Sequence, residues 1–532
     1  MPSDSGATTS PWMHERAEGF APLENDVRAD VCVVGAGITG LTTAYLLQRV
    51  GRAVVVLDAG AIGSGETGRT TAHLSNALDE GYCNLERLHG ERATRLAAES
   101  HTAAIDQIEA IVNQEGIECD FERLDGYLFL ARGDSAEKLE DELGAALRAG
   151  VADVRLLPRV PGVQSLAVPC MHFPRQAQFH PLRYLEGLAR ALVRDGGRVF
   201  TGTRVAEVRG GKPCRAVTES GHTVHADSVV VATNVPVNGG LVIHTKLSAY
   251  RTYVIGVRIP RGSVPRALYW DTEEPYHYAR LQRESDSHDL LIVGGEDHRT
   301  GQAHDTRQRF ERLEAWARRR FGADGPVVWR WSGQVMEPVD GLAFIGRNPL
   351  DAPHVYIATG DAGQGMTHGT IAGMLVRDLI CGKENPWAAL YDPGRKVLRG
   401  SAVRRYAREN LNVARQYARY VRRGEVSHVE QIAPGSGALM RHGPGKIAVY
   451  RDPAGSVHTY SAVCPHARCI VRWNETEESW DCPCHGSRFD PHGHVICGPA
   501  NARLEPVYIE GITDAGGLPE LPERPGPRTR PN

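Results

Sequence analysis

Apolar runs and glycines near the start of the chain predict one βαβ unit. The apolar run 31–34 leads directly into GAGITG at 35–40, and apolar residues then recur with helical spacing as far as Leu47. A second apolar run, 53–57, ends at Asp58. Residues 30–58 are therefore expected to form a strand, a glycine turn, a helix and a second strand.

Later segments change in periodicity and composition. Helical periodicity dominates 85–150, whereas alternating segments within 241–297 predict a separate antiparallel sheet. The strand-like run 355–359 leads into glycines and a helix at about 369–381. We expect the following organisation: a flexible arm at 1–27, a nucleotide-binding α/β region at 28–394, a basic linker helix at 395–425, a small all-β domain at 426–515, and a disordered tail at 516–532.

Composition and charge narrow the possible partners. The 532 residues include 61 basic and 64 acidic side chains, so no overall positive field draws the protein to nucleic acid. No apolar stretch is long enough to cross a bilayer, and the first twenty residues lack the pattern of a signal peptide. A cytoplasmic protein without a transmembrane segment is expected. The segment 395–423 holds ten basic residues and one acidic residue, Glu409, which fits either a solvated linker or a docking surface for an acidic partner.

The glycine turn has the full context of a dinucleotide fingerprint. Gly35 permits the tight turn, Gly37 lets the backbone approach a pyrophosphate, and Gly40 allows close packing of helix on strand. Asp58 would accept hydrogen bonds from the ribose hydroxyls, and the helix N-terminus would face the phosphates. The fingerprint by itself does not distinguish FAD from NAD.

Further segments of 30–380 resemble the D-amino-acid-oxidase-like family of FAD-dependent oxidoreductases. GSGETGRTTAH at 63–73 is similar to its second flavin loop, TRVAEV at 203–208 to its adenine-side strand, and DGLAFIG at 340–346 with GDAGQGMT at 360–367 to its C-terminal flavin loop. The resemblance implies a Rossmann-like fold that binds FAD. The expected FAD contacts, in addition to the fingerprint residues, are Thr67, Arg69, Thr70, Thr71, His73, Val205, Gly365, Met366 and Thr367.

Two points of this resemblance stay open. Some amine dehydrogenases of the family attach FAD covalently through a His in the second flavin loop, and the position of His73, four residues after Arg69, does not match theirs. On the expected substrate sheet an Arg could pair with a carboxylate of the substrate. The candidate catalytic residues there are Arg251, Tyr253, Tyr276 and Tyr278.

Cysteines and histidines cluster near the C-terminal end of the chain. Cys464 and His466 form one pair, and Cys482 and His485 form a second, separated by a 15-residue loop. Zinc can use two thiolates and two imidazoles. The surrounding CPHARC at 464–469, CPCHGSRFD at 482–490 and GPA at 498–500 instead resemble the loops of cytochrome bc-type Rieske proteins, in which these four residues hold a [2Fe–2S] cluster.

The Rieske resemblance implies further details. Cys469 and Cys484 stand where bc-type proteins have a disulfide, and Phe489 stands where they have a Tyr that donates to a cysteine sulfur. Fewer than 50 residues follow His485, too few for the catalytic domain of a Rieske oxygenase. We therefore expect a dehydrogenase that oxidises the C–N bond of an amino acid or secondary amine and passes electrons through the cluster to a protein or quinone. The alternative is an electron-transfer component that supplies a partner monooxygenase.

Overall fold

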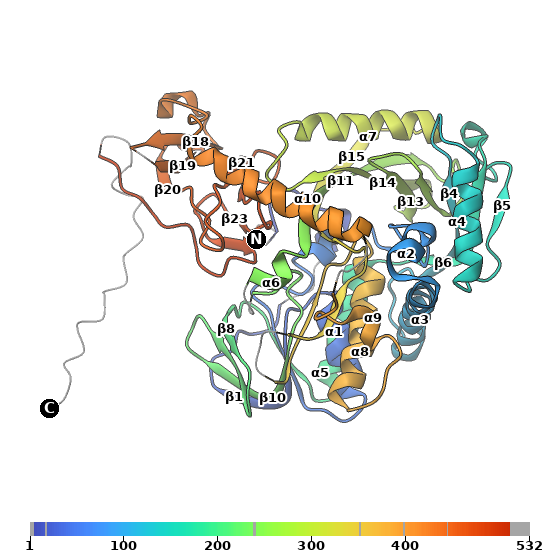
Figure 1. The fold of residues 1–532 in the computed structure, drawn as a ribbon, viewed down its shortest axis with the longest axis horizontal. Helices are drawn as coiled ribbons and strands as arrows, with labels where there is room; N and C mark the ends of the chain where they lie inside the picture. The colour runs from blue at the N-terminus through green and yellow to red at the C-terminus, as the bar shows by residue number, and fades with distance from the viewer. Residues whose placement is uncertain are drawn as a thin grey trace.

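The chain folds into a large α/β part and a small β part at its C-terminal end (Figure 1). The computed structural model describes residues 5–15, 19–237, 241–349, 353–396, 400–443 and 445–510. The tail expected to be disordered, 516–532, lies outside the described residues.

The predicted βαβ unit lies at the centre of an eight-stranded sheet. Strand β1 pairs in parallel with β2 on one side and with β10 on the other. Helix α1, between β1 and β2, packs against α5 and α8, so the strands are covered and read as continuous Val-rich runs. The elements are β1 (Val27–Val34), α1 (Ile38–Gln48), β2 (Val54–Leu57), β7 (Arg198–Phe200), β8 (Val205–Arg209), β9 (Cys214–Thr218), β10 (Thr223–Val231), β16 (Phe344–Arg347) and β17 (Val355–Thr359).

A second, nine-stranded sheet forms the expected substrate domain. Its strands run in the order β15-β11-β14-β13-β12-β4-β6-β3, with β5 beside β6, and only the β4–β12 pair is parallel. Helix α7 covers one face of this sheet with Phe310, Leu313 and Ala317, which are buried at helical spacing. The strands are β3 (His73–Leu74), β4 (Glu122–Phe129), β5 (Arg155–Leu157), β6 (Cys170–Gln178), β11 (Leu247–Pro260), β12 (Leu268–Asp271), β13 (His277–Arg283), β14 (His288–Arg299) and β15 (Val327–Pro338).

Most helices of the α/β part lie in the chain segments that connect the strands of the two sheets. The long α3 and the shorter α2 and α4 occupy the segment that was expected to be helical, 85–150. The helices of this part are α2 (Tyr82–His89), α3 (Glu91–Glu115), α4 (Glu137–Arg148), α5 (Pro181–Arg194), α6 (Leu241–His244), α7 (Thr306–Phe321), α8 (Gly365–Ile380) and α9 (Ala388–Tyr391), with short 3-10 turns η1 (Pro11–Glu15), η2 (Glu66–Arg69) and η3 (Gln164–Leu166).

The C-terminal part consists of two small antiparallel sheets. Helix α10 connects it to the α/β part and crosses the front of the molecule in Figure 1. One sheet has the order β18-β19-β20 and the other β21-β22-β23-β24. The elements are α10 (Gly400–Gln416), η4 (Tyr417–Tyr420), η5 (Val429–Gln431), β18 (Ser436–His442), β19 (Gly445–Arg451), β20 (Val457–Ser461), β21 (Arg472–Asn474), β22 (Ser479–Asp481), β23 (Arg488–Phe489) and β24 (Val495–Cys497).

The N-terminal segment differs from the flexible arm that the sequence suggested. Within residues 5–15, Trp12 is 1% exposed and donates from its indole to the carbonyl of Thr70 at 2.7 Å. The buried Ser10 donates to the carbonyl of Gly68 at 2.5 Å. The prediction of a flexible arm was wrong for these residues, because the segment packs between the two parts of the molecule and its polar groups form hydrogen bonds there.

Candidate flavin and iron–sulfur sites

The turn between β1 and α1 has space only for glycine at two positions. Gly35 has φ of +108°, and a Cβ there would lie 2.4 Å from the carbonyl oxygen of Ala232. A Cβ on Gly40 would lie 1.8 Å from the carbonyl oxygen of Gly35. Helix α1 begins at Ile38, whose amide donates to the hydroxyl of Thr67 at 3.1 Å, so only the remaining amides of its first turn can face an anionic group.

A cavity of about 730 Å³ extends from this turn to the substrate sheet. Asp58, at the end of β2, borders it and accepts from the amides of Ala36 at 2.5 Å and Gly60 at 2.8 Å. The cavity brings together segments from many separate regions of the chain, which suits an extended dinucleotide. The predicted FAD contacts that line it are Gly35, Gly37, Asp58, Thr67, Arg69, Thr70, Thr71, His73, Val205, Gly365, Met366 and Thr367; Gly40 acts in packing instead.

His73 is held as a neutral imidazole at the cavity wall. Its Nε2 lies 3.3 Å from the carbonyl oxygen of Ala279 and its Nδ1 lies 3.1 Å from the hydroxyl of Thr71. Burial, and to a lesser degree the charge of Arg280, lowers the pKa of His73 to about 3. Both ring nitrogens therefore have protein neighbours at this wall.

Arg69 borders the cavity, but its charge serves a different contact from the predicted one. The guanidinium lies 3.1 Å from the carboxylate of Glu477, which belongs to the C-terminal part, and both side chains are 0% exposed. It also donates to the carbonyl oxygens of Gly6 and Ser332, each at 2.8 Å. Arg69 therefore joins the flavin loop, the N-terminal segment and the C-terminal part through its guanidinium, and its predicted contact with FAD stays a prediction.

Two of the four catalytic candidates lie outside the cavity. Tyr276 and Tyr278 line it, whereas Arg251 and Tyr253 do not. Arg251 lies 3.7 Å from Glu477, and the hydroxyl of Tyr253 lies 2.9 Å from His298. Side chains of a strand alternate between its faces, and the cavity-lining residue of β11 is Thr252. The predicted candidates Arg251 and Tyr253 therefore lie on the face of this strand that points away from the cavity.

The substrate side of the cavity carries carboxylates that sequence analysis missed. Asp79, Glu80 and Asp361 line it, and the hydroxyl of Tyr276 lies 3.4 Å from Asp79. Burial raises the pKa of Asp79 to about 7, with a further contribution from the charge of Asp297. Burial also raises the pKa of Asp361 to about 6. No motif marks these residues, since they come from separate loops that only the fold brings together.

The four predicted cluster ligands converge on two loops of the C-terminal part. A hydrogen bond joins the thiols of Cys464 and Cys482 and lowers the pKa of Cys464. The rings of His466 and His485 lie 5.0 Å apart between centroids. Both Nδ1 atoms are buried without a hydrogen-bond partner among the described residues. Two neighbouring thiols and two neighbouring imidazoles with free nitrogens, all carried by the same two loops, fit a Rieske [2Fe–2S] cluster.

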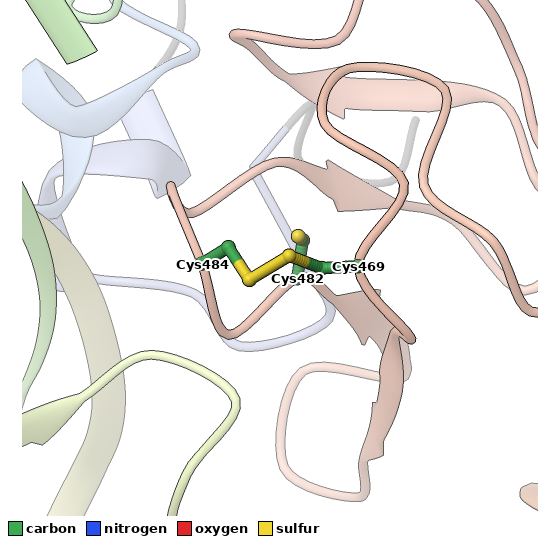
Figure 2. A group of neighbouring side chains, drawn as sticks. All are labelled: Cys469, Cys482 and Cys484. Carbon is green, nitrogen blue, oxygen red and sulfur yellow. A yellow bond between two sulfur atoms is a disulfide. The ribbon is translucent and has the colours of Figure 1, made fainter. Parts of the chain in front are cut away.

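A disulfide joins the two cluster loops, as the resemblance implied. Cys469 and Cys484 are bonded, with their Cα atoms 6.4 Å apart. Figure 2 shows the sulfur of Cys482 beside this bond. Because two of these three sulfurs are bonded to each other, the trio does not form a metal site of its own.

The cluster loops lie directly against the flavin cavity. Ile496 and Cys497 at the end of β24 and Gly498 of the loop 498–500 line the cavity itself. The side-chain amide of Gln334, in β15, donates to the carbonyl of Gly486 at 3.0 Å. The ring of His244, in α6, lies 5.0 Å from the ring of His466. Sequence analysis missed these contacts, because the residues involved are 152 or more positions apart along the chain.

No described helix combines the length and the apolar character needed to cross a membrane.

Comparisons with known proteins agree with both sites. The family model of FAD dependent oxidoreductases matches residues 30–379, and that of the Rieske [2Fe-2S] domain matches 423–509. The chain is 31% identical to the Bacillus subtilis Rieske 2Fe-2S iron-sulfur protein YhfW, over 92% of this chain and 96% of that protein. It is 26% identical to gamma-glutamylputrescine oxidoreductase of Escherichia coli, over 74% of this chain and 95% of that protein.

A solved structure shows the same fold in the α/β part. Glycine oxidase from Geobacillus kaustophilus superposes with a TM-score of 0.58 at 18% identity, covering 70% of this chain and 99% of that one. The cofactors are FAD in the α/β part and a [2Fe–2S] cluster in the C-terminal part. The chain therefore belongs to the family of FAD-dependent oxidoreductases, as an enzyme that carries a C-terminal Rieske domain.

Proposed function

We propose that this enzyme is a dehydrogenase that oxidises the C–N bond of an amino acid or secondary amine and delivers the electrons singly to an external acceptor. The observation that carries the proposal is that the end of β24 and the start of the loop 498–500, which resembles a Rieske cluster loop, form part of the wall of the flavin cavity. FAD supplies two-electron oxidation of an organic substrate, and the cluster supplies one-electron transfer. A fused cluster in this position is useful when electrons leave to an acceptor other than oxygen.

The charge of the cavity favours an amine cation as substrate. Asp79 and Asp361 line the cavity without a basic partner among the described residues, whereas Glu80 pairs with Arg405 at 2.8 Å. The basic residues that line it have other contacts: Arg69 pairs with Glu477 at 3.1 Å, Lys138 with Asp134 at 2.9 Å, and Arg204 donates to the carbonyl of Val495 at 3.1 Å, while Arg87 contacts the carbonyl of Cys83 at 3.3 Å. A substrate ammonium group would lower the repulsion among the buried carboxyl groups. Among the two proposed substrate classes, a secondary amine therefore fits better.

The chain's own residues would position such a substrate. Tyr276 and Tyr278 stack with ring centroids 5.5 Å apart and present an aromatic wall to the cavity. An ammonium group placed over such rings gains cation–π attraction, and Asp79 beside Tyr276 offers a charge-assisted hydrogen bond. These groups would hold the C–N bond toward the flavin loops that contain Met366 and Thr367.

The alternative function, an electron-transfer component for a monooxygenase, has less support. It requires a site for NAD(P)H, and the one further GxGxxG pattern in residues 59–532, GSGETG at 63–68, runs into the four-residue η2 and not into the α-helix that a dinucleotide fingerprint needs. It also gives no role to the acidic, aromatic wall formed by Asp79, Tyr276 and Tyr278.

An anaerobic screen tests the proposal. Secondary amines and amino acids are mixed with the holoenzyme, and bleaching of the flavin absorbance is recorded. In His466→Ala, bleaching by a true substrate should persist while transfer to a one-electron acceptor is lost. The exposed His494, which pairs with Asp490 at 3.0 Å, provides the control variant His494→Ala, which should retain both steps. Peroxide formation from oxygen at full rate in His466→Ala would contradict the relay.

A further inference from the structure

Helix α10 is anchored to the α/β part along one side. Ala402, Glu409 and Gln416 are buried at intervals of seven residues, so they share one face of the helix. The carboxylate of Glu409 pairs with Arg299 at 2.5 Å and accepts from the hydroxyl of Ser248 at 3.1 Å. The opposite side of the helix faces outward.

Exposed apolar side chains are concentrated on this segment of the chain. Among the described residues, half of the exposed large hydrophobic side chains belong to α10, η4 and the following residue. Val421 is the most exposed of them, at 81%. Scattered exposed apolar residues are ordinary, but a concentration on one short segment marks an interaction site. The five residues are Val403, Tyr406, Leu411, Tyr417 and Val421.

The outward side of α10 carries arginines around the exposed Leu411. Arg404, Arg408, Leu411 and Arg415 follow the spacing of one helical face, and Arg422 continues the exposed positive surface after η4. No described carboxylate lies within ion-pair distance of Arg404, Arg415 or Arg422. Glu409, the sole acidic residue of this segment, is turned inward. Exposed arginines with tyrosines and few acidic residues are typical of protein interfaces.

This surface adjoins the first cluster loop. The hydroxyl of Tyr417 donates to the carbonyl of Ala467 at 2.6 Å, and that of Tyr420 donates to the carbonyl of Arg468 at 2.5 Å. His466, a cluster ligand, is the neighbour of Ala467 in the chain, and Pro465 beside it is exposed. A protein seated on this surface would therefore contact the loop that holds the cluster.

We propose that the outward face of α10 and η4, through Val421 and Arg422, is the docking surface for an acidic one-electron acceptor protein. This inference rests on the proposed electron relay. Each oxidised substrate releases two electrons, so two acceptor molecules dock in turn, and each leaves with one electron from the cluster. The arginines attract and orient the acceptor, and the apolar side chains form the dry centre of the contact.

Binding of a probe protein tests the surface without turnover. The probe is an acidic blue-copper protein, plant plastocyanin, titrated into the oxidised holoenzyme by calorimetry at low ionic strength. We expect Arg415→Glu/Arg422→Glu to weaken binding by about tenfold or more, and added salt to weaken binding to the unaltered enzyme. Arg283→Glu/Arg307→Glu makes the same change of net charge on the α/β part and should change affinity less than about twofold.

A second variant tests the apolar contacts. Leu411→Ser/Val421→Ser should lower affinity while leaving its salt dependence unchanged, because no charge is altered. Equal affinity of the probe for all variants, no binding at low salt, or tighter binding of basic cytochrome c than of plastocyanin would overturn the proposal.

Two further outcomes would assign the surface to another occupant. If the unaltered enzyme is a dimer by sedimentation and Leu411→Ser/Val421→Ser is a monomer, the face joins two copies of this chain. Binding to phosphatidylserine vesicles that Arg415→Glu/Arg422→Glu abolishes would make it a membrane contact. Photoreduction of the flavin, followed by electron paramagnetic resonance of the cluster, tests the relay separately, because it needs neither substrate nor acceptor. A cluster that becomes reduced shows that the relay works even if the proposed docking surface is wrong.

Discussion

The guanidinium of Arg69 and the carboxylate of Glu477 lie 3.1 Å apart in the interior, although 408 residues separate them in the chain. Arg69 belongs to the loop that borders the flavin cavity, and Glu477 belongs to the Rieske domain. The hydroxyls of Thr8 and Ser332 also donate to Glu477. One buried carboxylate thus holds the N-terminal segment, the flavin loop and the Rieske domain in a single arrangement.

Removing this carboxylate should loosen the domain contact. In Glu477→Gln two buried guanidinium groups, those of Arg69 and Arg251, lose their counter-charge, and we expect a loss of about 3–5 kcal/mol in the free energy of unfolding. Denaturant unfolding measures it, with the exposed Glu478→Gln as control. Equal stability of Glu477→Gln and the unaltered protein would contradict a stabilising role for the contact.

The same carboxylate should make stability depend on acid pH. The arginines and hydrogen bonds around Glu477 lower its pKa to about 2 from an ordinary value of 4.5. A carboxyl group with a lowered pKa stabilises the folded state fully above its unfolded pKa, and this stabilisation is lost as pH falls toward the folded pKa. The stability difference between the unaltered protein and Glu477→Gln should therefore be full at pH 6 and shrink from about pH 5 downward. A difference that stays constant to pH 3 would exclude this titration.

Amine binding should strengthen as Asp79 ionises. Burial and the neighbouring Asp297 raise the pKa of Asp79 to about 7, so its negative form appears above neutral pH, where an amine is still protonated. The apparent Kd for an amine, from anaerobic flavin titration, should fall by up to about tenfold per pH unit below that pKa and level off above it. Asp79→Asn should bind the amine weakly at every pH. The control Asp106→Asn, at an exposed residue that pairs with Arg123 at 2.6 Å, should keep the normal pH profile.

The metal content should match a Rieske cluster. We expect one FAD, two iron and two acid-labile sulfides per chain, without stoichiometric zinc, because the same two loops carry two neighbouring thiols and two neighbouring imidazoles with free nitrogens. His485→Ala should lose the paramagnetic signal of the cluster and retain FAD. Zinc in place of iron after anaerobic purification would exclude the Rieske interpretation.

The reduction potential should respond to Phe489. This residue is fully buried in β23, within the core that includes Cys464 and Cys482, and it provides no hydroxyl to a cluster sulfur. A hydrogen bond to sulfur stabilises the reduced state, so Phe489→Tyr should raise the one-electron potential by roughly 60 mV if the bond contributes about 1.5 kcal/mol. Protein-film voltammetry measures the shift. An unchanged or lower potential would show that position 489 does not face a cluster sulfur.

Local motifs made much of this protein predictable. The βαβ unit and its glycine turn follow from adjacent residues, because the positive φ of Gly35 and the close contact of Gly40 with the carbonyl of Gly35 lie within the turn itself. The cluster loops are similarly self-contained, since each pair of ligands lies within four consecutive residues. The Cys469–Cys484 disulfide followed from the resemblance of those loops.

Only the tertiary structure decided which groups meet across the chain. The sequence places Arg251, Thr252 and Tyr253 on one strand, but the packing of β11 determines that Thr252 faces the cavity and that Arg251 faces Glu477. Arg69 matches a flavin-loop motif, yet a carboxylate 408 residues later takes its charge. Burying a charged side chain without a partner costs free energy, so each of these charges needs a partner in the folded protein. Which residue becomes that partner depends on how distant elements pack, and no local sequence pattern contains this information.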